Sequence, residues 1–320
     1  MLKYIIKRLL LSVVILLGVS LILFVLIDNM PSSYAENKIM EINKNGEIDQ
    51  QAIDAIMEMY ELNYFEWLGN MLKFDFGQSF TNMGADVVDV IKDNMLFSFL
   101  IAAIATVFEF MIAIPLGITA ATHQYSFRDY LVTVLVMIGI SLPGFFFGQI
   151  LRGVFSSGLG WLPFSGVGTT TKQLTGFAAA MDTIPYLILP ILTVVVISIG
   201  GRMRMTRTNM LEVLNSDYIR TARAKGLKER VVIYKHAFRN TMIPLVTSLA
   251  GLLPSLFSGA IITEQLFDLP GIGNVAYQAM MKGDVPLIMG YNMFLALLSI
   301  IGVLLADLMY AMVDPRVKLK

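Results

Sequence analysis

Few residues of this chain have the types and spacing that catalysis or metal binding requires. The 320 residues include no Cys and only two His, His123 and His236, so neither a thiolate metal site nor a disulfide framework is available. There is no H-E-x-x-H, no G-x-S-x-G and no G-x-x-x-x-G-K-[ST] motif. The 21 Met residues are scattered through apolar runs, which is typical of adaptable packing residues. We therefore expect no enzyme activity, no metal site and no cofactor in this chain.

One short stretch matches a nucleotide-binding pattern by chance. "GIGNVA", Gly271 to Ala276, fits G-x-G-x-x-A, but a dinucleotide site needs a preceding β-strand and a βαβ unit. The residues before it, "DLP", belong to a predicted loop. We interpret the two glycines as a turn that uses glycine's backbone freedom.

Glu109, in "TVFEFMIAIPLG", is the only carboxylate well inside a predicted membrane span. A charge in lipid is costly, so Glu109 must face protein or a wet cavity. Two interpretations stay open: a buried, hydrogen-bonded structural group, or a residue that lines a transport path. An ion-coupled secondary transporter would use such groups, but one carboxylate without an obvious partner is thin support for proton coupling.

The elements that position these residues are membrane helices. Hydrophobic residues make up 56% of the chain and charged residues 15%, against about 25% charged in soluble domains. Runs of about 20 apolar residues suit a bilayer. We predict an all-α integral membrane protein with an anchor helix (1–30), an external segment (31–93), a transmembrane core (94–312) and a tail (313–320). The six predicted spans are 9–27, 96–121, 130–151, 184–200, 242–262 and 287–312.

The first span also has the basic start of a secretory signal peptide. Its apolar run of about 19 residues is longer than the usual 7–15, and no small-residue cleavage site follows. The sequence therefore predicts a retained anchor.

The basic residues orient the spans. Of the 24 Lys and Arg residues, 17 lie in segments 1–8, 122–129, 202–240 and 313–320, and Lys/Arg-rich loops stay cytoplasmic. Residues 28–93 instead carry thirteen acidic residues and four Lys. We expect both termini and the loop 202–240 inside, with 31–93 and 263–286 outside.

Apolar residues between 53 and 71 recur at three- and four-residue steps, which predicts an amphipathic helix in the external segment. Such a helix would lie over the outer ends of the spans or form part of a docking surface for an external partner.

The stretch "DYIRTARAKGLKERVVIYKHAFRN", Asp217 to Asn240, carries seven Lys/Arg and two acidic residues. Its pattern predicts two short amphipathic helices bent at Gly226, which suits a C′ position. Charge alone would fit a helix pair on anionic lipid headgroups, but the small residues at the bend also permit close approach by another backbone. Shared faces are predicted for Ile219 with Ala222, and for Val231 with Tyr234 and Phe238.

"RTARAKGL…KHAFRNTMIPLV" resembles the cytoplasmic loop of permease subunits in binding-protein-dependent ABC importers, in the form typical of the dipeptide/oligopeptide and nickel branch. Arg220, Thr221 and Ala222 take the positions of its E-A-A motif, and Gly226 takes that of its Gly. The resemblance extends to "MLKYIIKRLLLSVVILLGVSLILFVL", "DFGQSF" (Asp75–Phe80), "TEQLFDLPGIG" (Thr263–Gly273) and "DLMYAMVDPR" (Asp307–Arg316). Departures are Arg220 for Glu, Thr221 for Ala, Phe238-Arg239 for L-P, and "DNMPSSYAENK" for the A-P-G-D/S-P form.

The resemblance implies a type I ABC importer transmembrane fold in a bacterial cytoplasmic (inner or plasma) membrane. It implies a second, similar permease, two cytoplasmic P-loop ATPases that bind ATP and Mg, an external substrate-binding protein, and no nucleic acid. The cargo implied is a short peptide or, alternatively, a nickel chelate. The chain lacks Cys and both His are predicted inside, which favours the peptide because metal handling uses such ligands. The residues implied in ATPase coupling are Arg220, Thr221, Ala222, Ala224, Lys225, Gly226 and Leu227.

Overall fold

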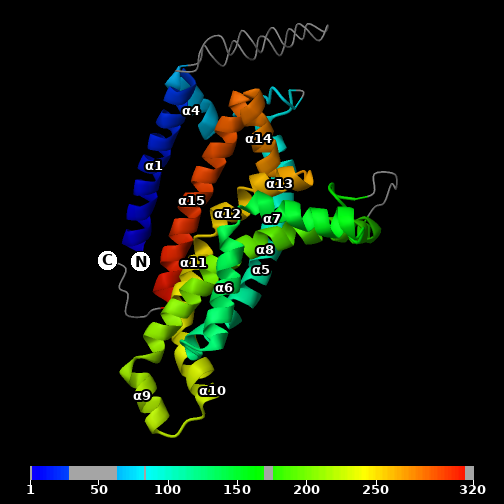
Figure 1. Cartoon of the computed structure of the whole chain (residues 1–320). Coiled ribbons are helices and arrows are strands. Elements are labelled where there is room, and N and C mark those ends of the chain that lie inside the picture. Colours follow the sequence, from blue (N-terminus) through cyan, green and yellow to red (C-terminus); the bar gives the residue numbers. More distant parts are fainter. Residues whose placement is uncertain (1, 29–62, 83, 169–175, 314–320) are drawn as a thin grey trace.

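The computed structural model describes residues 2–28, 63–82, 84–168 and 176–313. These residues are almost entirely helical (Figure 1), so the all-α prediction is confirmed. The predicted tail after residue 313 and most of the external segment lie outside the described residues.

Four helices of the described part are long and apolar enough to cross a membrane: α1 (Leu2–Asp28), α5 (Val87–Thr122), α8 (Gly176–Leu214) and α15 (Val285–Val313). The long helices α5 and α8 pack side by side through small residues. A Cβ at Gly117 would lie 2.6 Å from Thr206 Cβ, and Ala113 and Ala120 are fully buried. Small residues at such an interface let the two backbones approach closely.

The predicted span 130–151 is a bent pair of helices. Helix α6 (Phe127–Ser141) meets α7 (Gly144–Leu151) at 100°, and π-helical turns, Arg152–Gly158, continue α7. Leu142 is extended and Pro143 is the N-cap of α7. Since the residue before a proline disfavours the helical region, the bend falls at the position that the sequence marks.

The predicted span 242–262 is divided into α11 (Arg239–Ala250), α12 (Leu253–Phe257) and the start of α13 (Ile261–Phe267). A turn at Gly251–Leu252 and the left-handed Gly259 (φ +72°) interrupt it. By helix length and composition the described residues give four spans, or five if the bent pair counts as one. The predicted count of six is therefore not confirmed.

Helix α1 runs antiparallel to α15 at the edge of the bundle (Figure 1). Arg8 and Asp307 form an ion pair of 2.9 Å at one end. Toward the other end, Ser20 Oγ lies 2.9 Å from the hydroxyl of Tyr64, on helix α4 (Tyr64–Leu72). Asn63 caps α4 in a capping box with Glu66. Of the predicted helix 53–71, only this last part lies within the described residues.

Candidate functional site

The basic segment projects from one end of the bundle (Figure 1). Helix α8 continues to Leu214, so the predicted loop 202–240 begins inside a helix. After a short turn, α9 (Asp217–Ala224) leads to Gly226, and α10 (Glu229–Val231) continues as π-helical turns, Val232–Phe238. The helix–bend–helix arrangement predicted from the sequence is therefore confirmed.

Gly226 holds the bend between α9 and α10. Its φ is +75°, its N–H donates to the carbonyl of Arg223 at 2.9 Å, and Lys225 is the C-cap of α9. Gly226 thus takes the predicted C′ position. A Cβ at Gly226 would meet nothing within 4 Å, so within this chain the backbone angle requires glycine and the surrounding space does not.

One face of α9 packs inward. Ile219 is fully buried and Ala222 is 8% exposed, against a cluster that includes Met210, Val232 and Ala237. The predicted shared face of Ile219 and Ala222 is confirmed. The small size of Ala222 therefore serves packing within this chain.

The second predicted face is only partly buried: Phe238 packs against this cluster, whereas Val231 and Tyr234 are exposed. The π-helical turns change the periodicity of the segment, and the buried residues are Val232 and Ala237, five positions apart. Tyr234 is 53% exposed instead. A period of 3.6 does not apply where hydrogen bonds run from i to i+5.

The outward face of the segment combines charge with apolar side chains. Tyr218, Leu227 and Tyr234 are exposed large hydrophobic residues. The residues implied in coupling that lie on the exposed side are Arg220, Thr221, Ala224, Lys225, Gly226 and Leu227. This set, which excludes Ala222, is called the coupling surface below.

An ion pair closes the bend. Arg223 Nη2 donates to Glu229 Oε1 at 2.7 Å, and its Nε lies 3.2 Å from Oε2. The hydrogen bond from Arg223 holds the pKa of Glu229 below its usual value, and the same bond raises the pKa of Arg223. Both side chains are about half exposed, so solvent screens the pair and its contribution to stability is small.

Glu109 has a partner that the sequence did not reveal. Arg202 Nε donates to Glu109 Oε1 at 3.0 Å, its Nη1 donates to Ser248 Oγ at 2.7 Å, and its guanidinium lies 4.4 Å from the ring centre of Phe110. Arg202 was assigned to a cytoplasmic loop, although it lies within α8. The pair places an acid from α5 and a base from α8 in mutual contact with little exposure to solvent.

Glu109 also lines a cavity of about 150 Å³, together with Ser98, Thr106, Ser198 and Ser255. The structural and the path-lining interpretations of Glu109 are therefore compatible. One carboxylate oxygen is bound by arginine, while the residue borders a small, mainly apolar cavity between α5, α8 and α12 that Glu264 also lines.

A second arginine ties α8 to α6. Arg207 donates from Nε and Nη2 to the two carboxylate oxygens of Asp129, at 3.0 and 2.9 Å, and the N–H of Tyr125 donates to the same carboxylate at 3.1 Å. Bidentate pairs of this kind fix geometry as well as charge. Helix α8 is thus joined to α5 and to α6 shortly before it leads into α9.

Glu264 is the centre of a buried network. It is 1% exposed and accepts hydrogen bonds from Ser98 Oγ (2.7 Å), the N–H of Ala260 (3.1 Å) and the N–H of Asn274 (2.9 Å). Ser98 Oγ in turn accepts from the N–H of Ile272 at 2.8 Å. The carboxylate therefore joins α5, α13 and the start of α14 (Ile272–Lys282).

The two glycines of "GIGNVA" lie against the Glu264 carboxylate. Gly271 has an ordinary φ of −99°, so the expected use of glycine's backbone freedom is wrong. A Cβ at Gly271 would lie 2.3 Å from the Glu264 carboxyl group, and one at Gly273 would lie 2.8 Å from it. The glycines leave room for a buried acid. Sequence reasoning missed Glu264 because the residue lies in a segment predicted to be an external loop.

Asp284, between α14 and α15, forms a similar link to the segment that resembles the external D-F-G-x-S stretch. Asp284 is fully buried and accepts from Ser79 Oγ (2.5 Å), Thr81 Oγ1 (2.7 Å) and the N–H of Thr81 (2.9 Å). Its other oxygen accepts from the N–H of Leu287 at 3.3 Å. The loop after α4 is thereby tied to the start of α15.

Comparisons with known proteins agree on the class of molecule. Residues 113–319 match the family described as "Binding-protein-dependent transport system inner membrane component". The chain is 39% identical over 324 residues to the oligopeptide transport system permease protein AppB of Bacillus subtilis, covering 99% of this chain and 100% of the relative. It is 32% identical to the dipeptide transport system permease protein DppB of Alkalihalophilus pseudofirmus, covering 99% and 100%.

The fold also resembles a solved structure. A chain of the inward-facing MetNI methionine ABC transporter aligns with a TM-score of 0.53 at 16% identity, over 71% of this chain and 97% of that chain. At this identity the likeness concerns the fold alone, and it confirms the type I importer fold that the sequence motifs implied.

Proposed function

Because this chain belongs to the family of inner-membrane components of binding-protein-dependent transport systems, we propose that it forms half of the membrane path of an ATP-driven importer of short peptides. It is a transport subunit and not an enzyme. The peptide cargo is supported by relatives that match over almost their full length and are described as oligopeptide and dipeptide transport permeases. The partners proposed are a second permease, two cytoplasmic ATPases and an external substrate-binding protein, and ATP and Mg belong to the ATPases.

The observation that carries this proposal is the projecting coupling surface. A basic turn that also exposes Leu227 and Tyr234 combines charge with apolar surface, as the surfaces that bind a protein partner do. In the proposed mechanism, closure of the ATPases displaces α9, which is packed on α8 through Ile219 and Met210. The ion pairs Arg202–Glu109 and Arg207–Asp129 then pass the displacement to α5 and α6.

The proposed function also requires a particular orientation of the chain in the membrane. We place both termini and the coupling surface inside, and residues 263–286 outside. In this Cys-free chain, Gln124→Cys and Met281→Cys both introduce a thiol at an exposed position. A membrane-impermeant maleimide should label Met281→Cys in intact cells, and should label Gln124→Cys only after the inner face is opened. The reverse pattern would overturn the orientation.

The complex itself is the second test. Purifying the tagged chain from its native membrane should recover a second permease and two P-loop ATPases. Cells that lack the gene should fail to grow on di- to pentapeptides as the sole source of a required amino acid. Normal peptide growth with lost nickel accumulation would replace the peptide by a nickel chelate. A chain that purifies alone and transports without ATP would point to a secondary transporter.

A further inference from the structure

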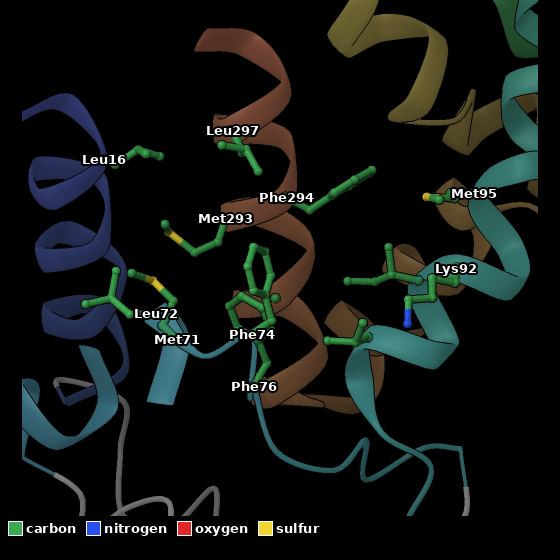
Figure 2. A pocket seen from close by; sticks show the side chains of 13 residues that line it. Leu16, Met71, Leu72, Phe74, Phe76, Lys92, Met95, Met293, Phe294 and Leu297 are labelled. Carbon is green, nitrogen blue, oxygen red and sulfur yellow. The ribbon is translucent and has the colours of Figure 1, made fainter. Parts of the chain in front are cut away.

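An apolar groove of about 470 Å³ lies between α1, α4, α5 and α15. Figure 2 shows Leu16 on α1 facing Met293 and Leu297 on α15, with Phe74 in front of α15 and Lys92 on the far side. Lys92 is the only charged residue among those that line it, and the others offer hydrocarbon or aromatic surface. A peptide would find no partners here for its backbone N–H and C=O groups, which rules it out as the occupant.

A polar hollow of about 390 Å³ adjoins this groove and shares Phe74, Phe76, Val88 and Lys92 with it. Its other lining residues include Asp75, Asp86 and Asp89. Lys92 thus stands between an apolar space and an acidic one, with its Nζ 3.4 Å from Asp89. The stem of a lysine can line the first while its ammonium reaches the second.

The backbone conformation of Phe74 is a second observation, independent of the charges around the groove. It follows α4 with φ +62°, and its N–H and that of Asp75 bond to Met71 and Asn70 in the pattern that normally places glycine at this position. A phenylalanine here is strained, and its ring is still 67% exposed within the described part of the chain. The strain is understandable if the ring covers an apolar ligand.

We propose that this groove binds a zwitterionic aminophospholipid such as phosphatidylethanolamine. One acyl chain occupies the apolar groove against Phe74 and Met293. The phosphate contacts Lys92, and the headgroup ammonium lies among Asp75, Asp86 and Asp89. The basic Lys92 beside three acidic residues matches the phosphate and ammonium of this headgroup. An anionic phospholipid would also pair with Lys92, but it would bring a negative charge toward the three carboxylates without an ammonium to compensate it. Binding requires only that the chain lies in a membrane, so it stands apart from the proposed cargo.

The test uses the purified complex in nanodiscs with phospholipids that carry a photoreactive diazirine in one acyl chain. Crosslinked peptides should contain Leu72, Phe74, Met293 or Leu297, and phosphatidylethanolamine should exceed phosphatidylglycerol. Lys92→Gln should lower the yield about fivefold, equivalent to about 1 kcal/mol for a Lys at a phosphate surface. Replacing Asp86 and Asp89 by Asn should abolish the preference for phosphatidylethanolamine, and Phe74→Gly should lower the yield of both lipids.

Each variant has a matched control outside the groove. Lys282→Gln removes an exposed Lys from the end of α14, and Asp93→Asn removes an exposed carboxylate from α5 itself. Tyr125→Gly relieves the other strained exposed aromatic, at φ +61°. The controls should crosslink as the unmodified chain does. Crosslinks spread evenly along α1, equal yields for both lipids, or no crosslinks to the groove residues would each overturn the proposal.

Discussion

Ala224→Trp is expected to abolish transport while the protein still folds and inserts. Ala224 lies at the exposed end of α9 in the coupling surface, so a large side chain there meets no core residue of this chain. At a tight protein contact, overpacking costs about 1–3 kcal/mol, which corresponds to about 5- to 150-fold weaker association. Peptide uptake and co-purification of the ATPases should both fall, with membrane abundance and the melting temperature in detergent unchanged.

Two variants of Gly226 separate bulk from backbone strain. Gly226→Asn should impair transport less than Gly226→Val, a side chain of similar size, because Asn tolerates a left-handed φ and its Cβ meets nothing within this chain. Gly226→Val should impair transport through the backbone, at a cost of about 1–2 kcal/mol. Ala222→Trp, in contrast, should reduce folding itself because Ala222 is buried.

A lipid-surface role for the basic turn makes the opposite prediction. Lys225→Gln with Lys228→Gln would then be the damaging change, and Ala224→Trp would be harmless. If Ala224→Trp retains uptake and ATPase binding, the α9–α10 turn is not the ATPase contact.

Glu264→Leu is expected to destabilise the protein strongly. It leaves Ser98 Oγ and the N–H groups of Ala260 and Asn274 without their acceptor. Each buried unsatisfied donor costs about 1–3 kcal/mol, and three such losses approach the total stability of about 5–15 kcal/mol of an ordinary domain. The melting temperature in detergent and the yield of inserted protein should both fall sharply.

Companion variants show whether the buried network is the cause. Glu264→Gln keeps the shape and one acceptor oxygen, so its loss should be smaller. Gly271→Ala should also destabilise, because its Cβ would lie 2.3 Å from the carboxyl group, whereas Gly18→Ala meets nothing within 4 Å and should not. Glu212→Gln, at an exposed carboxylate of α8, controls for the lost charge. A melting temperature of Glu264→Gln and Gly271→Ala equal to that of the unmodified chain would refute this role.

The sequence by itself determined the class of the protein and much of the projecting turn. The membrane spans of α1, α5 and α15 can be predicted from their apolar runs because a helix that crosses the lipid must be hydrophobic along its whole span. Gly226 was assigned correctly because a C′ position constrains one residue's backbone. The shared face of Ile219 and Ala222 followed from a short-range period.

Only the tertiary structure decided the partners of the buried charges. Glu109 meets Arg202 across 93 positions of sequence, and Glu264 meets Ser98 across 166. No local pattern encodes such contacts, because they depend on which faces of α5, α8 and α13 meet. The same holds for Gly271, whose missing Cβ makes room for a carboxylate, and for the π-helical turns that bury Val232 and Ala237. Composition and periodicity are local properties of the sequence, whereas the burial of a charge depends on which distant residues pack against it.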